Sequence, residues 1–176
     1  MSQAGSDREV RTVAAPEDAF AVAMRDHGQR LARLAYFLCP GDRSGAEDLV
    51  AETYARVWPR WKSAQVDDLL PYLRRAMVNL ASKHRRHRLV VQRHGAASEP
   101  SSAPGADEGL GARIDLARAL GTLPSSQRVV VVLRYLEDMS EAEIASLLHI
   151  APGTVKSRLS RALETLRADL RGGGDG

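Results

Sequence analysis

The stretch from Ser140 to Leu163, SEAEIASLLHIAPGTVKSRLSRAL, restricts the possible folds of this chain more than any other segment. Ser140 and Glu143 have the spacing of a capping box, in which each side chain bonds the other residue's backbone N–H, so a helix is predicted to start here. Pro152 suits the first turn of a second helix, where its missing N–H leaves no hydrogen bond unmade. Apolar residues then follow at helical spacing, at Val155, Leu159, Ala162, Leu163, Leu166 and Leu170. The sequence therefore predicts two helices joined by a tight turn at residues 149–151.

The other face of this second helix is polar and basic. At about 100° per residue, six side chains fall on that face or its edges: Thr154, Lys156, Ser157, Arg158, Ser160 and Arg161. Hydroxyls and cations so placed hydrogen-bond base edges and phosphates when a helix lies in the major groove. A charged helix face is often only solvated, but the short turn and the excess of four cations over two acids favour DNA contact. We therefore predict a DNA-binding helix-turn-helix.

Composition predicts an all-α protein of two small helical domains joined by a flexible linker. The 176 residues are 44% hydrophobic but only 5% aromatic, which suits helical packing, and the net charge of +3 permits a nucleic-acid partner. Cys39 is the single cysteine, and no metal-binding, phosphate-binding or nucleophile motif is present. We expect no cofactor, no metal, no catalysis and no small-molecule substrate. With neither a secretory signal nor about 20 consecutive apolar residues, the chain is expected to be cytoplasmic, without membrane insertion.

Residues 1–15 are predicted to be a disordered arm and residues 16–91 a first domain. Its first helix has apolar residues at helical spacing from Phe20 to Leu38, and Ser44 with Glu47 is expected to cap a second helix that runs to Trp61. Trp58 and Trp61 continue an apolar stripe and are interpreted as core residues. The other face carries an acidic patch of Asp48, Ala51, Glu52 and Ala55. This patch is either simply solvated or accepts a basic partner helix, since its small residues permit close approach.

A third helix is predicted from near Pro71, with a basic edge beside its apolar stripe. This edge consists of Tyr72, Arg75, Asn79, Lys83 and Arg86. Cations that hold a backbone, next to groups that stack on or bond exposed bases, are typical of single-stranded DNA binding. A solvated basic helix end is an equally good interpretation of the cations alone. His84 and His87 lack an acid or a cysteine at ligand spacing, so no metal site is predicted there.

Residues 92–111, QRHGAASEPSSAPGADEGLG, have the composition of a flexible linker, and about twenty residues reach at most about 65 Å. Residues 112–171 form the second domain and 172–176 a tail. The run Val129 to Val132 is compatible with a strand. Its position between LPSS and the capped helix, followed by Leu133, Tyr135 and Leu136, favours a buried helix.

Three segments together resemble the extracytoplasmic-function (ECF) sigma factors of the bacterial sigma-70 family, close to the actinobacterial SigE-like group. They are AEDLVAETYARVW (46–58), PYLRRAMVNLASKHRRHR (71–88) and LPSSQRVVVVLRYLEDMSEAEIASLLHIAPGTVKSRLSRA (123–162), in the family's order and spacing. The resemblance spans about residues 17–171, and the third segment is its most specific part. Two positions depart from the family pattern: Ala51 stands where Gln is usual, and His149 stands where Gly or Asp often sits in the turn.

This resemblance implies a function for each segment. The first would bind core RNA polymerase at its β′ clamp helices through Asp48 and Glu52, with a further contact to the β flap expected. The second would melt promoter DNA and read the minus-ten element, with Asn79 facing a flipped base. The third would place the second helix of the helix-turn-helix on the minus-thirty-five element. Factors of this kind are often held inactive by an anti-sigma factor.

A helix-turn-helix regulator of the response-regulator type is the alternative. That class needs a receiver or ligand-binding domain in front of the DNA-binding domain. Residues 1–91 show three helical patterns and neither alternating strands nor a phosphorylatable aspartate pocket. The sequence therefore favours the sigma factor.

Overall fold

The computed structural model describes residues 16–63, 69–92 and 110–172, and every regular element in these ranges is an α-helix. The elements are α1 (Pro16–Leu38), α2 (Arg43–Ser63), α3 (Leu70–Gln92), α4 (Leu110–Thr122), α5 (Ser125–Tyr135), α6 (Glu141–Leu148) and α7 (Pro152–Gly172). The predicted all-α fold is confirmed. The expected arm at 1–15 lies outside the described residues, as do 93–109 of the expected linker and 173–176 of the tail. Helices α3 and α4 extend into the two ends of the expected linker.

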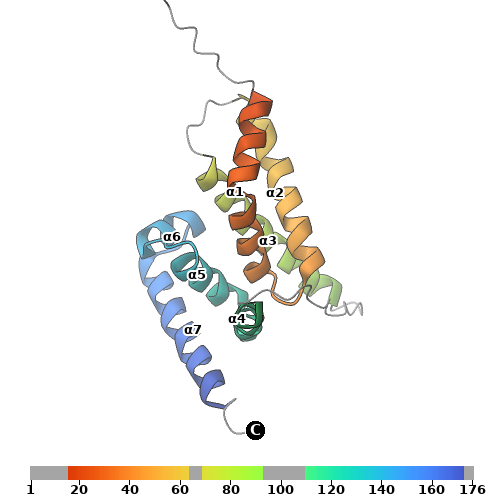
Figure 1. The fold of residues 1–176 in the computed structure, drawn as a ribbon. Helices are drawn as coiled ribbons and strands as arrows, with labels where there is room; N and C mark the ends of the chain where they lie inside the picture. Colours follow the sequence, from red (N-terminus) through yellow and green to blue (C-terminus); the bar gives the residue numbers. More distant parts are fainter. Residues whose placement is uncertain (1–15, 64–68, 93–109, 173–176) are drawn as a thin grey trace, which may run out of the picture.

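Helices α1 to α3 form the N-terminal unit. Figure 1 shows α1 and α2 side by side, with α3 crossing behind them. Their buried faces meet in a core whose fully buried members include Leu31, Leu34, Phe37, Leu49, Leu73, Met77 and Leu80. Phe20 packs on Trp58 with ring centroids 4.8 Å apart, and Trp61 also packs against this core. The interpretation of both tryptophans as core residues is confirmed, although each remains partly exposed.

The start of α2 differs from the prediction. The side chain of Asp42 caps this helix, because its Oδ1 accepts a hydrogen bond of 2.7 Å from the backbone N–H of Gly45. Glu47 does not bond back to the helix start but pairs with Arg43 at 2.8 Å. The expected capping box of Ser44 and Glu47 is therefore wrong. An aspartate two residues earlier supplies the same kind of acceptor.

Helices α4 to α7 form the C-terminal unit. The run Val129 to Val132 is buried within α5, which confirms the prediction of a buried helix. Leu120, Leu133 and Ile144 are fully buried beside it. Tyr135 was expected to continue this buried run, but 59% of its surface is exposed. It lies at the last position of α5, where the helix leaves the core.

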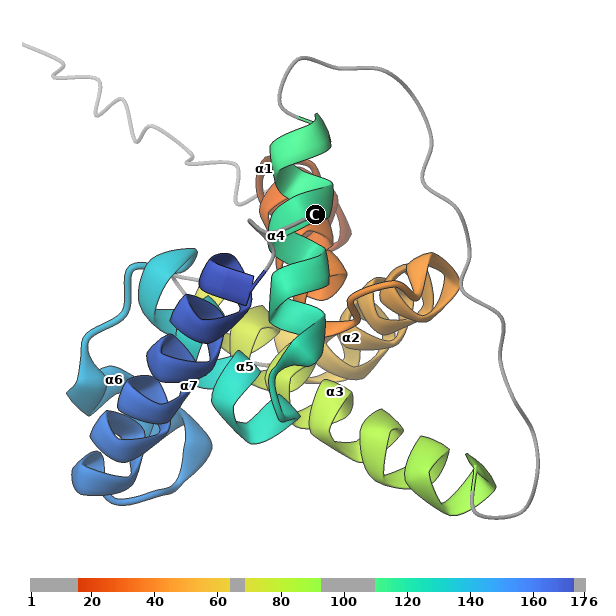
Figure 2. The same cartoon turned by 90° about the horizontal axis from the view of Figure 1, so that it is seen from below.

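The two units pack against each other (Figures 1 and 2): α1 contacts α4 and α5, and Arg74 of α3 reaches Glu137 after α5. The sequence did not predict this arrangement. The carboxylate of Glu137, after α5, reaches two arginines of the N-terminal unit. Its Oε2 accepts from Nε of Arg30 at 3.0 Å and lies 2.7 Å from Nη2 of Arg74. The Glu137 side chain is only 4% exposed. A buried carboxylate is stable only when it is paired, so the packing of the two units depends on the two arginines that pair with Glu137.

A second polar contact between the units involves Arg128 of α5. Its guanidinium donates to the carbonyl of Leu120 at 2.8 Å and of Leu123 at 3.0 Å, and it also reaches the carbonyl of Leu38 at 3.3 Å. The last carbonyls of a helix lack intrahelical partners, so a cation placed there satisfies them. Arg128 therefore caps the end of α4 and joins it to the end of α1.

Candidate nucleic-acid interface

The turn between α6 and α7 has the geometry of a helix-turn-helix. Ser140 Oγ accepts from the backbone N–H of Glu143 at 3.2 Å, and Glu143 Oε2 accepts from the backbone N–H of Ser140 at 2.7 Å. The predicted capping box is confirmed. The hydrogen bond from the Ser140 hydroxyl, followed by that from the Ser140 N–H, lowers the pKa of Glu143 below its usual value.

His149 ends α6 in the left-handed conformation, with φ of 54°, and its N–H donates to the carbonyl of Ala145. A non-glycine residue pays a steric cost there, which explains why the turn favours small residues such as glycine at this position. Ile150 also donates to the Ala145 carbonyl, at 3.1 Å. The departure at His149 thus leaves the turn closed by two hydrogen bonds, and α7 begins at Pro152 as predicted.

Helix α7 buries one face and exposes the other. Val155, Leu159 and Ala162 pack into the C-terminal unit. Four of the six residues predicted to contact DNA are exposed: Lys156, Ser157, Ser160 and Arg161. Thr154 is half-buried at the helix start. The exposed face carries hydroxyls beside cations, the combination that base and phosphate contacts need.

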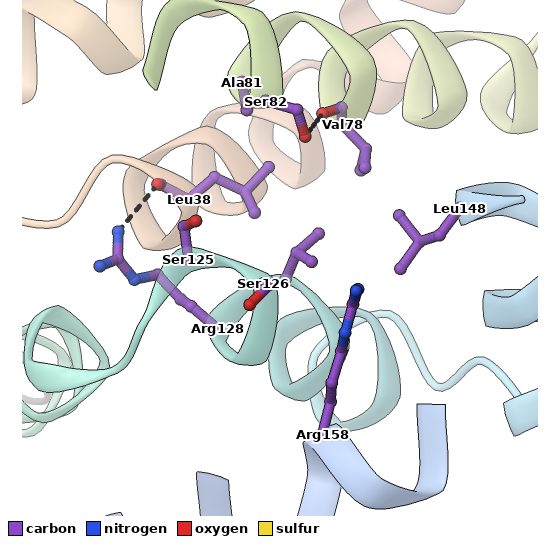
Figure 3. Close-up of a pocket in the computed structure, with 10 residues that line it drawn as sticks. Leu38, Val78, Ala81, Ser82, Ser125, Ser126, Arg128, Leu148 and Arg158 are labelled. Atoms are coloured by element: carbon purple, nitrogen blue, oxygen red, sulfur yellow. Dashed lines mark hydrogen bonds between the residues drawn. The ribbon is translucent and has the colours of Figure 1, made fainter. Parts of the chain in front are cut away.

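Arg158 departs from the predicted position. It is half-buried and lines a cavity of about 270 Å³ between the two units. Figure 3 shows its side chain pointing from α7 into this cavity, near Leu148 and Ser126. Val78, Ala81 and Ser82 of α3 line the same cavity. The sequence placed Arg158 on the edge of the polar face, and in the structure this edge faces α3 of the N-terminal unit across the cavity.

The basic edge of α3 is exposed as far as side chains are described. Tyr72 is 54% exposed, and Arg75, Asn79 and Lys83 are also exposed. The side chain of Arg86 lies outside the described residues. Leu73, Met77 and Leu80 on the opposite side are fully buried. Helix packing thus fixes the direction in which the edge faces, and the final turns of α3 extend beyond the other helices (Figure 2).

The acidic patch on α2 combines two different carboxylates. Asp48, Ala51 and Ala55 are exposed. Glu52 is 41% exposed, and its Oε2 lies 2.5 Å from Nε2 of His84 on α3. The acid beside His84 therefore comes from a different helix, which no local spacing indicated. No cluster of three metal-binding side chains occurs within the described residues.

A helix-turn-helix in one unit and an exposed basic edge in the other define a DNA-binding protein made of two helical domains. Comparison with known proteins identifies the family. The family model described as Sigma-70 region 2 matches residues 23–89, and that described as Sigma-70, region 4 matches residues 113–166. The chain belongs to the sigma-70 family, in its ECF group, and is an RNA polymerase sigma factor that binds core polymerase and promoter DNA.

Two relatives match this chain over most of their length. The RNA polymerase sigma-E factor of Streptomyces coelicolor is 37% identical over 148 residues, covering 84% of this chain and 83% of that protein. The ECF sigma factor SigL of Mycobacterium tuberculosis is 34% identical over 169 residues, covering 92% and 95%. Among solved structures, the sigma factor RpoE in complex with the anti-sigma factor NepR from Bartonella quintana has a TM-score of 0.72 at 26% identity. That match covers 90% of this chain and 99% of RpoE.

The response-regulator alternative is not favoured, because the N-terminal unit matches sigma region 2 rather than a receiver domain. Among the described residues, no helix is both long and apolar enough to cross a membrane.

Three residues that matter for the arrangement of the site were missed from the sequence: Glu137, Arg30 and Arg74. Arg30 lies 107 positions before Glu137 in the sequence, and Arg74 lies 63 positions before it. No periodicity or motif links residues so far apart, and each belongs to a helix or turn that is explained without it. Only the packing of the two units brings them together.

Proposed function

We propose that the two units divide promoter recognition between them. Helix α7 reads the minus-thirty-five element through Thr154, Lys156, Ser157, Ser160 and Arg161, with Arg158 joining once it is uncovered. The basic edge of α3 holds the opened minus-ten element, with Asn79 as the base reader. The observation that carries this proposal is the exposure of two separate polar faces, one on α7 and one on α3, each backed by a buried apolar face.

The acidic patch binds core polymerase at its β′ clamp helices, and the C-terminal unit contacts the β flap. Support for the first contact comes from the exposure of Asp48 and from the small exposed residues Ala51 and Ala55 around it. Small side chains permit a partner helix to approach closely, and two carboxylates complement a basic surface. The protein acts in the cytoplasm by binding rather than by catalysis.

An anti-sigma factor is a further partner in this proposal. Its support is the similarity to RpoE, whose structure contains the anti-sigma factor NepR. Such a partner should compete with core polymerase for this chain. Simultaneous binding of both, seen as one complex of all components in size-exclusion chromatography, would contradict this part of the proposal.

Run-off transcription tests the proposed function. Core polymerase is supplied with genomic DNA of the encoding organism, with and without this protein, and the 5′ ends of the transcripts are mapped. We expect new start sites that share a pair of upstream sequence elements only when the protein is present. Start sites identical to those of core polymerase alone would refute the proposal.

A further inference from the structure

Promoter binding requires the two units to lie far apart. By their numbering, the minus-ten and minus-thirty-five elements are about 25 base pairs apart, which is about 85 Å along a duplex at about 3.4 Å per base pair. In the structure, Arg158 of α7 lines the same cavity as Val78 and Ser82 of α3. Val78 directly precedes Asn79 of the basic edge, and Ser82 follows it by three positions. The arrangement of the units in the structure therefore cannot engage both elements at once.

The ion pairs between the described parts of the two units converge on one carboxylate. Glu137 Oε2 accepts hydrogen bonds from Nε of Arg30 at 3.0 Å and from Nε of Arg74 at 2.9 Å. It also lies 2.7 Å from Nη2 of Arg74. The Arg74 side chain is 13% exposed and that of Glu137 is 4% exposed. Both arginines belong to the N-terminal unit and the carboxylate to the C-terminal unit, so all three interactions cross between the units.

The same packing hides part of the DNA-binding surface. Arg158, on the helix proposed to read the minus-thirty-five element, points into the cavity rather than outward (Figure 3). On α3, the face formed by Arg74, Val78 and Ser82 lies beside the basic edge and is directed toward the C-terminal unit. The closed arrangement thus half-buries Arg158 of α7 and places the C-terminal unit beside the basic edge of α3, whose described residues stay exposed.

We propose that Glu137 is an intramolecular latch: with Arg30 and Arg74 it holds the free protein in a closed state that half-buries Arg158, cannot engage both promoter elements and opens before promoter binding. This inference rests on the proposed division of promoter recognition between the two units. The closed state needs no partner protein, because all three latch residues belong to this chain.

The character of the contact suits a reversible latch. The interface between the units contains a cavity and several polar groups beside the apolar contacts that join the two cores. Contacts between domains of one chain are typically more polar than obligate interfaces and permit relative motion. Arg30 remains 45% exposed in the closed state, so water already reaches one side of the latch. When the units separate, all three charged groups become hydrated, which offsets the loss of their mutual attraction.

The test compares the full-length wild-type protein with variants of either side of the latch. Glu137→Gln keeps the size of the side chain but removes its charge. Arg30→Gln with Arg74→Gln alters the other unit and leaves the loop before the helix-turn-helix untouched. Glu141→Gln is the matched control, because Glu141 is an exposed acid in the first turn of α6.

Two measurements are made without polymerase. Small-angle X-ray scattering gives the radius of gyration. Fluorescence anisotropy gives the affinity for a random-sequence duplex of about 20 base pairs, two helical turns. We expect both latch variants to have a larger radius of gyration than wild type and to bind the duplex more tightly, because the buried ion pairs that hold the closed state are lost. The Glu141→Gln control should match wild type in both.

The outcomes separate the latch from the proposed function. If both latch variants match the control, or if they expand without binding the duplex more tightly, the latch is refuted. Should Glu137→Gln lose helix content by circular dichroism, the arginine variant decides alone. Failure of wild-type protein in run-off transcription would refute the proposed function, whereas the scattering result does not depend on polymerase.

Discussion

The ring nitrogen Nε2 of His84 on α3 lies 2.5 Å from Oε2 of Glu52 on α2. This contact joins the helix that carries the basic edge to the helix that carries the acidic patch. Asp48, four positions before Glu52, is exposed. The two carboxylates of the patch therefore differ: His84 fixes the position of Glu52, while Asp48 lies open to a partner.

The first prediction concerns polymerase binding by the acidic patch. Replacing both Asp48 and Glu52 with lysine should weaken binding to core polymerase, because it reverses the charge presented to a basic partner helix. Affinity is measured by labelling the protein and titrating core polymerase in moderate salt. Helix content should stay unchanged, because neither side chain is part of the buried core, although the Glu52 contact with His84 is lost.

Two further variants separate charge from folding. Glu52→Gln removes the charge but keeps an acceptor near His84, so it should weaken polymerase binding without altering thermal stability. The matched charge control is Asp18→Lys with Asp26→Lys, two exposed acids of α1. Wild-type affinity in the Asp48 and Glu52 double reversal would show that the patch is only solvated.

The second prediction is a pH dependence of the capping box. The pKa of Glu143 is lowered in the folded protein from an ordinary value of 4.5, first by the Ser140 hydroxyl and then by the Ser140 N–H. A group whose folded pKa is depressed contributes stability above its unfolded pKa and loses it as the pH falls through the folded pKa. The ionised Glu143 should therefore stabilise α6 at neutral pH and lose this contribution as the pH falls through its depressed pKa.

Ser140→Ala is the variant that tests this, with an expected cost of about 0.5–2 kcal/mol at pH 7 from loss of the helix cap. Urea unfolding of wild type and variant is followed from pH 7 to pH 3. The difference between them should shrink toward acid. A difference that is constant with pH would mean that the ionised Glu143 does not contribute through Ser140.

The third prediction separates base readers from phosphate contacts on α7. Alanine at a base-reading residue should cost about 1–3 kcal/mol and relax preference at one promoter position. Loss of a phosphate contact should weaken all sequences alike and reduce the salt dependence. Holoenzymes with Ser157→Ala, Ser160→Ala or Arg161→Ala are used to select from promoters with a randomised upstream element. The selected sequences give the base preference of each variant.

Arg167→Ala is the control on the same helix, an exposed cation beyond the predicted contact residues. It should leave sequence preference unchanged. If the variants at Ser157, Ser160 and Arg161 also leave it unchanged, α7 does not enter the groove in the proposed orientation.

The sequence was sufficient where the determining interactions are local. The capping box of Ser140 and Glu143 spans one turn of helix, and its geometry is as predicted. The cap of α2 shows the limit, since Asp42 and Ser44 both carry suitable acceptors and only the chain path decides that Asp42 is used. Apolar periodicity likewise identified the core faces, because the buried side of a helix returns about every three to four residues.

The long-range contacts could not be predicted. Glu52 and His84 are 32 positions apart, and Glu137 and Arg30 are 107 apart. In the sequence, each of these charged residues is consistent with a solvent-exposed position on its own helix or turn. Which of them pair is decided by how the helices and the two units pack. Arg158 was placed on the correct helix, but its half-burial follows from the other unit covering it.

The last prediction is that the basic edge acts on opened DNA, with Asn79 reading a base and the cations holding phosphates. Unstacking a base costs a few kcal/mol, so a factor that opens a promoter must recover this by binding bases that are accessible only in the open state. A side-chain amide can recognise a base edge, whereas cations bind phosphates of any sequence. Asn79 is exposed beside Arg75 and Lys83, as this role requires.

Asn79→Ala should therefore leave binding to core polymerase and to the upstream element nearly intact, yet reduce open-complex formation and alter preference at one base of the downstream element. Permanganate reactivity of promoter thymines is compared for wild-type and mutant holoenzyme on duplex and pre-melted templates. A pre-melted bubble should restore opening but not base preference, because melting and reading depend on different contacts. Ser82→Ala is the matched control, since Ser82 bonds the carbonyl of Val78 at 3.0 Å within α3. Equal reactivity and equal base preference for wild type and Asn79→Ala on both templates would show that Asn79 is an ordinary solvated helix residue.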